Sequence, residues 1–340
     1  MNLAAILEQH VRRRPDRVAI VFGKKRLTYE ALNAWANQIA GGLAASGIGH
    51  GDHVALLCPN LPYFPAAYFG ILKTGATVVP LNVLLKPREM AYHLRDADVK
   101  TLLCFEGTPE LPMADAAKAA IAVVPSCERL IVLPREGSGA FADDPDVVTL
   151  AQITANQPST FDAFPTAEDD TAVILYTSGT TGRPKGAELT HLNMTMNAMV
   201  SAELCAASHD EQGDHRTAVT LPLFHATAQT VQMNAYHHLG GALVLLPRFD
   251  PAALVDVMMR ERITHWIGVP TMYWSLLQYV RENKIDVSSL ASTLKLAISG
   301  GAPMPVELLK DFQQTFGLRI VEGYGLSETS PVACFNPPVC

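Results

Sequence analysis

The sequence has 340 residues, of which 49% are hydrophobic and 17% are charged, a balance typical of a globular enzyme and not of a disordered chain. Its net charge of −7 at pH 7 shows no excess of basic residues that would bind nucleic acid, so we expect no nucleic-acid partner. No apolar run reaches the roughly 18 residues that a transmembrane segment needs, and peripheral contact with a membrane is left open. The apolar run at the N-terminus is too short, and a charged residue follows it too early, for a signal peptide.

Short β-branched runs alternate with segments of helical period along the chain. In chain order we expect a strand over 18–22, a helix over 28–43, a strand over 54–57, a helix near 63–72, and strands over 77–79, 218–221, 243–246 and 294–298. Asp250 and Pro251 favour a helix start, because Asp caps the first N–H groups and Pro suits the first turn. The alternation predicts an α/β fold with mainly parallel sheets and covering helices.

The stretch over 136–170 has a different character. It is rich in Gly, Pro and Ser and carries eight acidic residues without Lys or Arg. We expect a surface excursion there, with one short strand over 147–150.

The six cysteines, at 58, 104, 127, 205, 334 and 340, include no Cys-x-x-Cys pair and are interpreted as reduced thiols of a cytoplasmic protein. Spacing alone would allow Cys334 to pair with Cys340, but nothing else indicates an oxidising compartment. The eleven histidines form no His-x-x-x-His or His-Glu-x-x-His pattern, so we expect no zinc.

The most informative segment runs from Thr177 to Gly186, directly after an apolar run over 172–176. It holds four hydroxyls, three glycines and one lysine. Glycines let backbone N–H groups approach an anion, and Lys185 adds a charge suited to phosphate. Pro184 before the lysine and Gly186 after it exclude a Walker A loop. We interpret the segment as a phosphate-binding loop, with a merely flexible surface loop as the alternative. The residues expected at the phosphates are Thr177, Ser178, Gly179, Thr180, Thr181, Gly182 and Lys185.

This loop resembles the phosphate-binding signature of the adenylate-forming (AMP-binding) superfamily of acyl-CoA synthetases, aryl-CoA ligases and related enzymes. The run from Glu322 to Thr329, Glu-Gly-Tyr-Gly-Leu-Ser-Glu-Thr, matches a second motif in the family's order. The resemblance covers essentially the whole chain and is strongest to bacterial medium- and long-chain fatty acyl-CoA synthetases. It implies two similar doubly wound lobes, lobe A at about 52–207 and lobe B combining about 1–51 with 208–340.

The resemblance also implies roles for the second motif. Tyr324, between Gly323 and Gly325, would stack on adenine, Ser327 would contact the α-phosphate, and Glu328 would bind Mg²⁺. Most relatives carry threonine where Ser327 stands; because the hydroxyl is kept, we expect a tuning effect only.

Three further segments are expected near the substrates. In the family an aromatic–histidine pair lines the acyl carboxylate, which favours Phe224, His225 and Ala226, although a lone histidine is more often structural. The turn of Gly300, Gly301 and Ala302 would lie between nucleotide and acyl group, and its glycines would also serve a tight βα turn. Tyr273 is a weaker candidate for the substrate channel, with core packing as the alternative.

The implied reaction joins a carboxylate to the α-phosphate of ATP, releasing pyrophosphate, and then transfers the acyl group to coenzyme A. We expect Lys185, His225, Ser327 and Glu328 to carry it, with ATP, Mg²⁺ and coenzyme A as cofactors and a fatty acid as substrate. Alternatives are a 4-coumarate-like aryl-CoA ligase and a non-catalytic nucleotide- or lipid-binding homologue. Family members usually continue into a β-barrel and a C-terminal lid. Because this chain stops at Cys340, we expect an ATP- and acyl-binding platform with weak activity or none.

Overall fold

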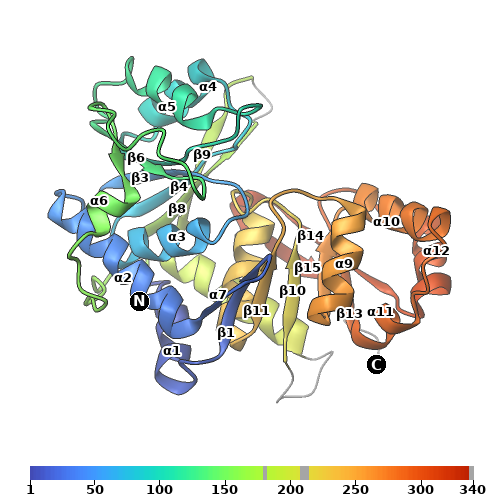
Figure 1. The fold of residues 1–340 in the computed structure, drawn as a ribbon. Helices are drawn as coiled ribbons and strands as arrows, with labels where there is room; N and C mark the ends of the chain where they lie inside the picture. Colours follow the sequence, from blue (N-terminus) through green and yellow to red (C-terminus); the bar gives the residue numbers. More distant parts are fainter. Residues whose placement is uncertain (179–181, 207–213, 337–340) are drawn as a thin grey trace. The chain divides into compact units, whose positions relative to one another are not determined.

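The computed structural model describes residues 1–178, 182–206 and 214–336. Its chain divides into two compact units. The first contains Met1–Val11 and Glu30–Met194, and the second contains Arg12–Tyr29 and Thr195–Cys340. Each unit is built on a mainly parallel sheet with covering helices, so the predicted α/β class is confirmed for both (Figure 1).

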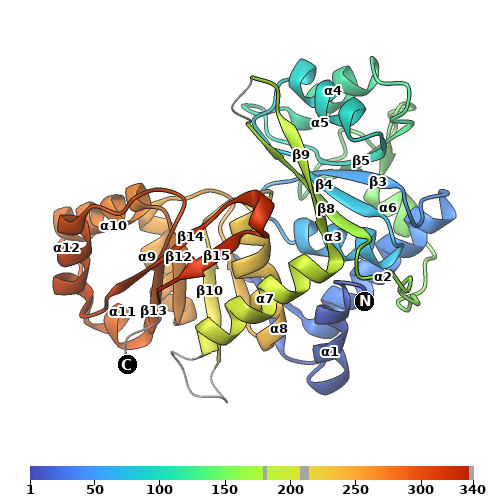
Figure 2. The same cartoon turned by 180° about the vertical axis from the view of Figure 1, so that it is seen from behind.

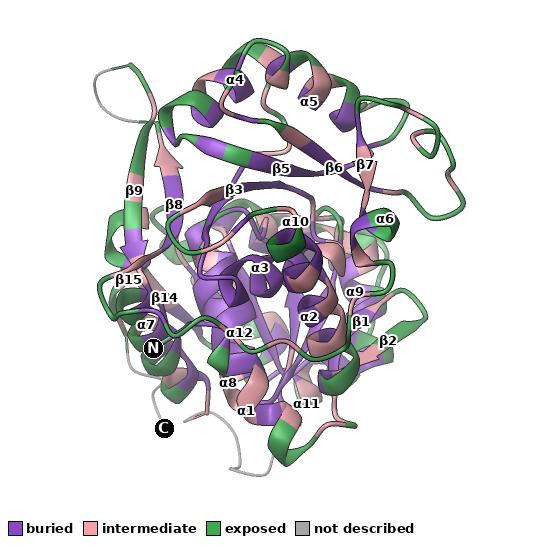
Figure 3. Cartoon of the chain, turned by 90° about the vertical axis from the view of Figure 1, so that its left-hand side faces the viewer, coloured by how far each residue is buried: buried purple, intermediate pink, exposed green. Residues whose placement is uncertain are grey.

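The sheet of the first unit is parallel except at one edge. In spatial order its strands are β7 (Val148–Thr149), β6 (Arg129–Leu133), β5 (Val99–Phe105), β3 (His53–Leu57), β4 (Thr77–Pro80), β8 (Thr171–Thr177) and β9 (Lys185–Thr190). Among these described strands the antiparallel pair is β8 with β9. Figure 3 colours most of β3, β5 and β6 as buried, whereas β9 is largely exposed.

Helices cover both faces of this sheet, with α4 and α5 on one face and α3 on the other (Figure 1). The bounds of the helices assigned wholly or partly to the first unit are α1 (Ala5–Arg13), α2 (Tyr29–Ala45), α3 (Tyr63–Lys73), α4 (Pro87–Asp96), α5 (Met113–Ile121), α6 (Leu150–Thr154) and α7 (His191–Ala206). The expected excursion over 136–170 holds β7, close to the predicted strand, and also α6, which the sequence analysis did not anticipate.

Helix α2 packs closely against its neighbours in the first unit, because glycines leave no side chain at the contacts. A Cβ on Gly42 would lie 2.3 Å from the carbonyl oxygen of Ile153, and one on Gly70 would lie 2.8 Å from Cγ2 of Ile39. The first compact unit includes residues 30–51, which the predicted boundaries place in lobe B. The lobe boundaries near 52 and 207 stay a prediction.

A buried histidine begins α7. His191 is fully buried, and its Nδ1 accepts a hydrogen bond of 3.0 Å from the backbone N–H of Leu3. Burial is the largest cause that lowers the pKa of this imidazole, to about 4. The folded protein therefore holds the His191 side chain in its neutral form.

Replacing His191 by asparagine should reduce the loss of folding free energy that occurs as the pH falls from 6.5 to 4. An unfolded histidine has a pKa of about 6.5, so the unfolded chain takes up a proton that the folded one resists as the pH falls from 6.5 to 4. The wild-type protein should lose up to about 3 kcal/mol of folding free energy in this window through His191. The asparagine side chain keeps an acceptor for the N–H of Leu3 without titrating. Urea unfolding of both proteins at pH 7.5 and pH 4.5 measures the difference, and parallel profiles would contradict the assignment.

The sheet of the second unit is parallel in its centre and antiparallel at both edges. In spatial order its strands are β15 (Val332–Phe335), β14 (Ile320–Gly325), β13 (Leu296–Ser299), β12 (His265–Gly268), β10 (Arg216–Val219), β11 (Ala242–Leu245), β1 (Val18–Phe22) and β2 (Lys25–Thr28). The antiparallel pairs among them are β14 with β15 and β1 with β2.

The helices of this unit lie on both faces of its sheet, with α9 and α10 on one face and α8 on the other (Figures 1 and 2). Their bounds, with the π-helix η1 and the 3₁₀-helix η2, are η1 (Ala228–Asn234), α8 (Ala235–Leu239), α9 (Pro251–Glu261), α10 (Pro270–Glu282), α11 (Ser288–Thr293), α12 (Val306–Phe316) and η2 (Ser327–Thr329). Helix α9 begins as predicted, since the Asp250 carboxylate accepts a 2.8 Å hydrogen bond from the N–H of Ala253.

Candidate active site

The second unit contains a cavity of about 430 Å³ at the carboxyl ends of β10, β12, β13 and β14. Because these four strands are parallel, the loops that follow them meet at one edge of the sheet, where open α/β sheets bind ligands. The cavity brings together eight residues that the sequence predicts for the site: His225, Ala226, Gly300, Gly301, Gly323, Tyr324, Gly325 and Ser327. The wall also includes Val231 from η1 and Val332 and Phe335 from β15, which no sequence motif predicted.

The Tyr-Gly motif forms the end of β14 and packs against β15. A Cβ on Gly325 would lie 1.9 Å from the carbonyl oxygen of Pro331, and one on Gly323 would lie 2.8 Å from the Phe335 ring. Both glycines are therefore required by the contact between these two strands. Between them Tyr324 is 62% exposed, so its ring is accessible to a flat ligand at the cavity.

The turn after β13 forms another wall of the cavity. Gly301 has φ +77°, a left-handed conformation that residues with a side chain adopt only at a cost. A Cβ on Gly300 would lie 3.1 Å from the carbonyl oxygen of Gly323 on the neighbouring strand. Ala302 follows in the same turn but is not part of the cavity wall. The two glycines thus serve the tight turn and also leave room for a ligand.

His225 lies at the exposed side of the cavity in the loop after β10. Its ring packs beside that of Phe224, with 4.7 Å between the ring centroids, and Phe224 itself lies in the core rather than on the wall. The surrounding protein lowers the pKa of His225, with desolvation as the cause. Desolvation therefore favours the neutral form of the imidazole.

Ser327 and Glu328 lie on the short helix η2, which follows β14. Ser327 is part of the cavity wall, whereas Glu328 is exposed beside it and does not line it. Within the described residues, no group of three or more His, Cys, Asp and Glu side chains could hold a metal ion. A Mg²⁺ ion commonly takes one or two carboxylates and completes its shell with water and substrate phosphates, so a single Glu328 fits such an ion.

Tyr273 corrects an expectation, because it lies in the core and not on the substrate cavity. The side chain is fully buried, and its hydroxyl donates a 2.7 Å hydrogen bond to the carbonyl of Ile298. Its ring packs on Trp266 and Phe312, at centroid distances of 4.4 and 5.2 Å. These contacts anchor α10 and α12 to the sheet, which is the structural alternative considered for this residue.

The predicted phosphate-binding loop connects β8 and β9 of the first unit. Thr177 and Lys185 face each other in the antiparallel register, and Lys185 is exposed. Gly182 has φ +97°, which explains the glycine there. The residues Gly179, Thr180 and Thr181, predicted to bind phosphate, lie outside the described part of the chain.

Two tyrosines that the sequence analysis did not single out anchor this hairpin. The Tyr92 hydroxyl donates a 2.8 Å hydrogen bond to the carbonyl of Pro184, directly before Lys185. The Tyr176 hydroxyl donates a 2.8 Å hydrogen bond to the Asp96 carboxylate. Both contacts tie the ends of the loop to α4. Hydrophobic pattern alone could not reveal them, since the partners are about 80 residues or more apart.

Replacing Tyr92 by phenylalanine should weaken the ATP binding predicted for this loop about 3- to 10-fold, because it frees the backbone next to Lys185 at a cost of about 1 kcal/mol. Tyr63→Phe is a matched control, since its hydroxyl donates to the carbonyl of Pro134 at 3.0 Å. Both variants should lose similar stability in urea unfolding, while calorimetry with ATP should show a weaker Kd for Tyr92→Phe alone. An equal loss of ATP affinity in both would contradict a positioning role.

Comparisons with known proteins identify the family. The family model described as AMP-binding enzyme matches residues 7–340, and the chain belongs to this family. It is 34% identical to a long-chain-fatty-acid–CoA ligase of Bacillus subtilis over 98% of this chain and 61% of the relative. It is 36% identical to a feruloyl-CoA synthase of an Amycolatopsis species over 95% of this chain and 59% of the relative.

A solved structure shares the fold. The crystal structure of the anthranilate CoA ligase AuaEII in complex with anthranoyl-AMP has a TM-score of 0.88 and 25% identity, covering 99% of this chain and 62% of that one. The chain therefore spans about 60% of the length of the relatives it matches. Within the described residues, no helix has both the length and the apolar character that crossing a membrane requires.

Proposed function

We propose that this protein is an acid–thiol ligase, which uses ATP to convert a carboxylic acid to an acyl-adenylate and then to a coenzyme A thioester. The observation that carries the proposal is the cavity at the carboxyl edge of the second sheet, where accessible Tyr324 stands between two glycines. Membership of the AMP-binding family supports it. A cytoplasmic location is part of the proposal, supported by Cys58, Cys104, Cys127 and Cys205, which are buried and not in disulfides.

In the proposed mechanism the protein positions two anions, the acyl carboxylate and ATP, and stabilises the negative charge at the phosphates. The chemistry needs no covalent enzyme intermediate. Tyr324 stacks on adenine, and Ser327 donates its hydroxyl to the α-phosphate. Lys185 and the hydroxyls of its loop bind the phosphate groups of ATP. The neutral imidazole of His225 faces the acyl carboxylate without adding a charge.

Glu328 would hold Mg²⁺, which supplies positive charge to the phosphate oxygens when bound. A test that does not depend on turnover is the Mg²⁺ dependence of ATP affinity. Glu328→Gln should reduce the gain in ATP affinity that Mg²⁺ gives to the wild-type protein, with little change in its absence.

The proposed substrate is a fatty acid, supported by the similarity to a long-chain-fatty-acid–CoA ligase and by small residues such as Ala226 and Gly323 on the cavity wall. An aromatic acid is the second candidate. It is favoured by the comparable similarity to a feruloyl-CoA synthase.

Calorimetry with ATP and Mg²⁺, followed by pyrophosphate release with palmitate and with 4-coumarate, tests the proposal. Release with palmitate supports the fatty-acid ligase, and release with 4-coumarate alone supports the aryl ligase. Binding of ATP without release with either acid would support an ATP- and acyl-binding platform without activity of its own, and would contradict adenylation of these two classes of acid by this chain. Failure to bind ATP would contradict the whole proposal.

A further inference from the structure

A second cavity, of about 330 Å³, lies in the second unit at the opposite edge of the sheet. It is formed around the starts of β10, β12 and β13, where Arg216, Thr264 and Lys295 stand. Because the three strands are parallel, this edge is remote along the strands from the carboxyl-end cavity, and the two cavities share no lining residue. The proposed ligase reaction makes no use of it.

The side chains around this second cavity are mainly cationic. Arg216, Arg260, Arg262 and Lys295 line it, against the two carboxylates of Asp214 and Glu261. The cavity therefore carries an excess of positive charge, although the sequence as a whole is acidic. Such a local excess attracts anions.

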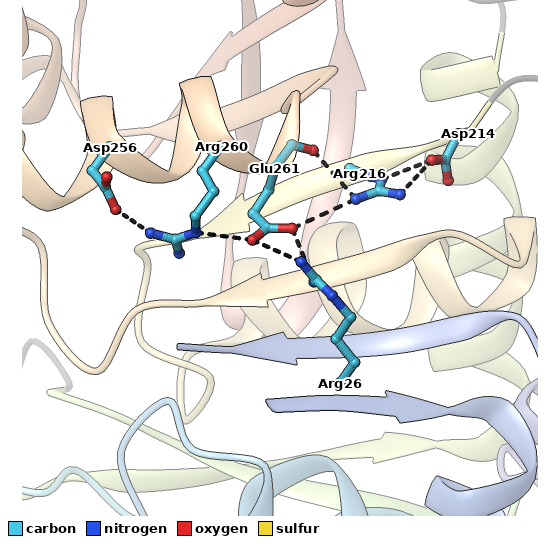
Figure 4. Close-up of polar contacts among 6 residues, drawn as sticks. All are labelled: Arg26, Asp214, Arg216, Asp256, Arg260 and Glu261. Atoms are coloured by element: carbon cyan, nitrogen blue, oxygen red, sulfur yellow. Dashed lines mark hydrogen bonds and ion pairs between the residues drawn. The ribbon is translucent and has the colours of Figure 1, made fainter. Parts of the chain in front are cut away.

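Both carboxylates are already engaged by arginines. Glu261, whose side chain is 1% exposed, contacts Arg26 at 2.9 Å, Arg260 at 3.0 Å and Arg216 at 3.6 Å (Figure 4). Asp214 contacts Arg216 at 2.7 Å. Asp256 also contacts Arg260, so three carboxylates offset these three guanidinium groups, and the charge left for a ligand is that of the other two lining cations, Arg262 and Lys295.

The other two cations have no carboxylate partner among the described residues. Lys295 donates a 2.8 Å hydrogen bond to the carbonyl of Ser292, close to the end of α11. Arg262 caps the end of α9 with its backbone in a left-handed conformation. Cations near helix carboxyl ends are favourable in themselves, and these two add positive charge to the cavity that no carboxylate among the described residues offsets.

The chemistry of the lining selects the class of ligand. The hydroxyls of Thr264, Ser292 and Thr293 already donate to backbone carbonyls, so the donors left for a ligand are guanidinium and ammonium groups. Arginine forks match phosphate oxygens in pairs, and lysine adds a point charge. We propose that this cavity is an anion site that binds a phosphate monoester, carried either by a soluble metabolite or by a phospholipid headgroup.

The double variant Arg262→Gln with Lys295→Gln tests the proposal, because both side chains are exposed and are not paired with the buried Glu261. Lys284→Gln is the matched control, since Lys284 is also exposed and has a left-handed backbone like Arg262 but lies outside the cavity. Circular dichroism and urea unfolding establish that all proteins are folded. Inorganic phosphate is titrated by calorimetry at constant ionic strength, with Lys185→Gln as a further control for phosphate that binds the proposed ATP loop.

The expected result is a phosphate Kd that rises about 10- to 100-fold in the double variant and stays unchanged in Lys284→Gln. The same rise is expected when the double variant is made in the Lys185→Gln background, where phosphate cannot use the proposed ATP loop. Sedimentation with phosphatidylcholine vesicles, with and without phosphatidic acid, separates the two sources. Binding that requires phosphatidic acid and is lost in the double variant assigns the headgroup, and phosphate binding without vesicle binding assigns a soluble ester. If neither probe binds, or if the double variant binds both as well as the wild type does, the proposal is wrong.

Discussion

Replacement of Gly325 by alanine is expected to cost about 3 kcal/mol of folding free energy, because the new methyl group has no space. Its Cβ would lie 1.9 Å from the carbonyl oxygen of Pro331 and 2.8 Å from the carbonyl carbon. That oxygen belongs to the backbone and also accepts a 3.0 Å hydrogen bond from the N–H of Leu326. The two strands must separate to relieve the contact, so the substitution removes a hydrogen bond as well.

Gly49→Ala is the control for this prediction, since a Cβ on Gly49 would meet no atom within 4 Å and its φ is not positive. Urea unfolding monitored by circular dichroism should show a large loss for Gly325→Ala and a change within about 0.5 kcal/mol for Gly49→Ala. Similar unfolding curves for the two variants would contradict the packing of β14 against β15. Because Tyr324 and Ser327 flank this glycine, ATP binding should be lost together with stability.

The Tyr-Gly motif shows what can be learned from sequence and what cannot. The motif lies at a cavity because it stands at the end of a strand. Apolar runs locate strands well, since β1 coincides with the strand predicted over 18–22. Contact with a ligand alone does not explain why residues 323 and 325 are glycines. They are required by Pro331, directly before β15, and by Phe335 on β15, a strand whose antiparallel pairing no local pattern reveals.

Contacts between distant segments explain the other differences. The run at 269–274 is compatible with a channel or with the core, and only the packing of α10 against α12 places Tyr273 in the core. Likewise, the arginines around Glu261 come from β2, β10 and α9, so sequence spacing could not indicate their cluster. Local pattern therefore predicts elements and motif positions, whereas the partners of each side chain depend on the register and order of the strands.

Loss of the Lys185 charge is expected to reduce pyrophosphate release by about 100- to 1,000-fold in kcat/KM, the usual effect of removing one group that stabilises a charged transition state. Lys185 begins β9 opposite Thr177, and its side chain is exposed. It has no ion pair among the described residues, so its charge is available to a phosphate group. Lys185→Gln keeps most of the length of the side chain and removes the charge, which separates electrostatics from packing.

Lys24→Gln serves as the control, since Lys24 is an exposed lysine in the turn between β1 and β2. Neither variant should change stability by more than about 0.5 kcal/mol, because neither side chain is buried. The acid that gives the highest release with the wild-type protein is used for the assay. An effect of Lys185→Gln below about 10-fold would exclude the transition-state role, since that is less than one charge-assisted hydrogen bond contributes. A large effect on kcat with an unchanged Kd for ATP would instead show that Lys185 acts mainly as charge develops on the phosphates.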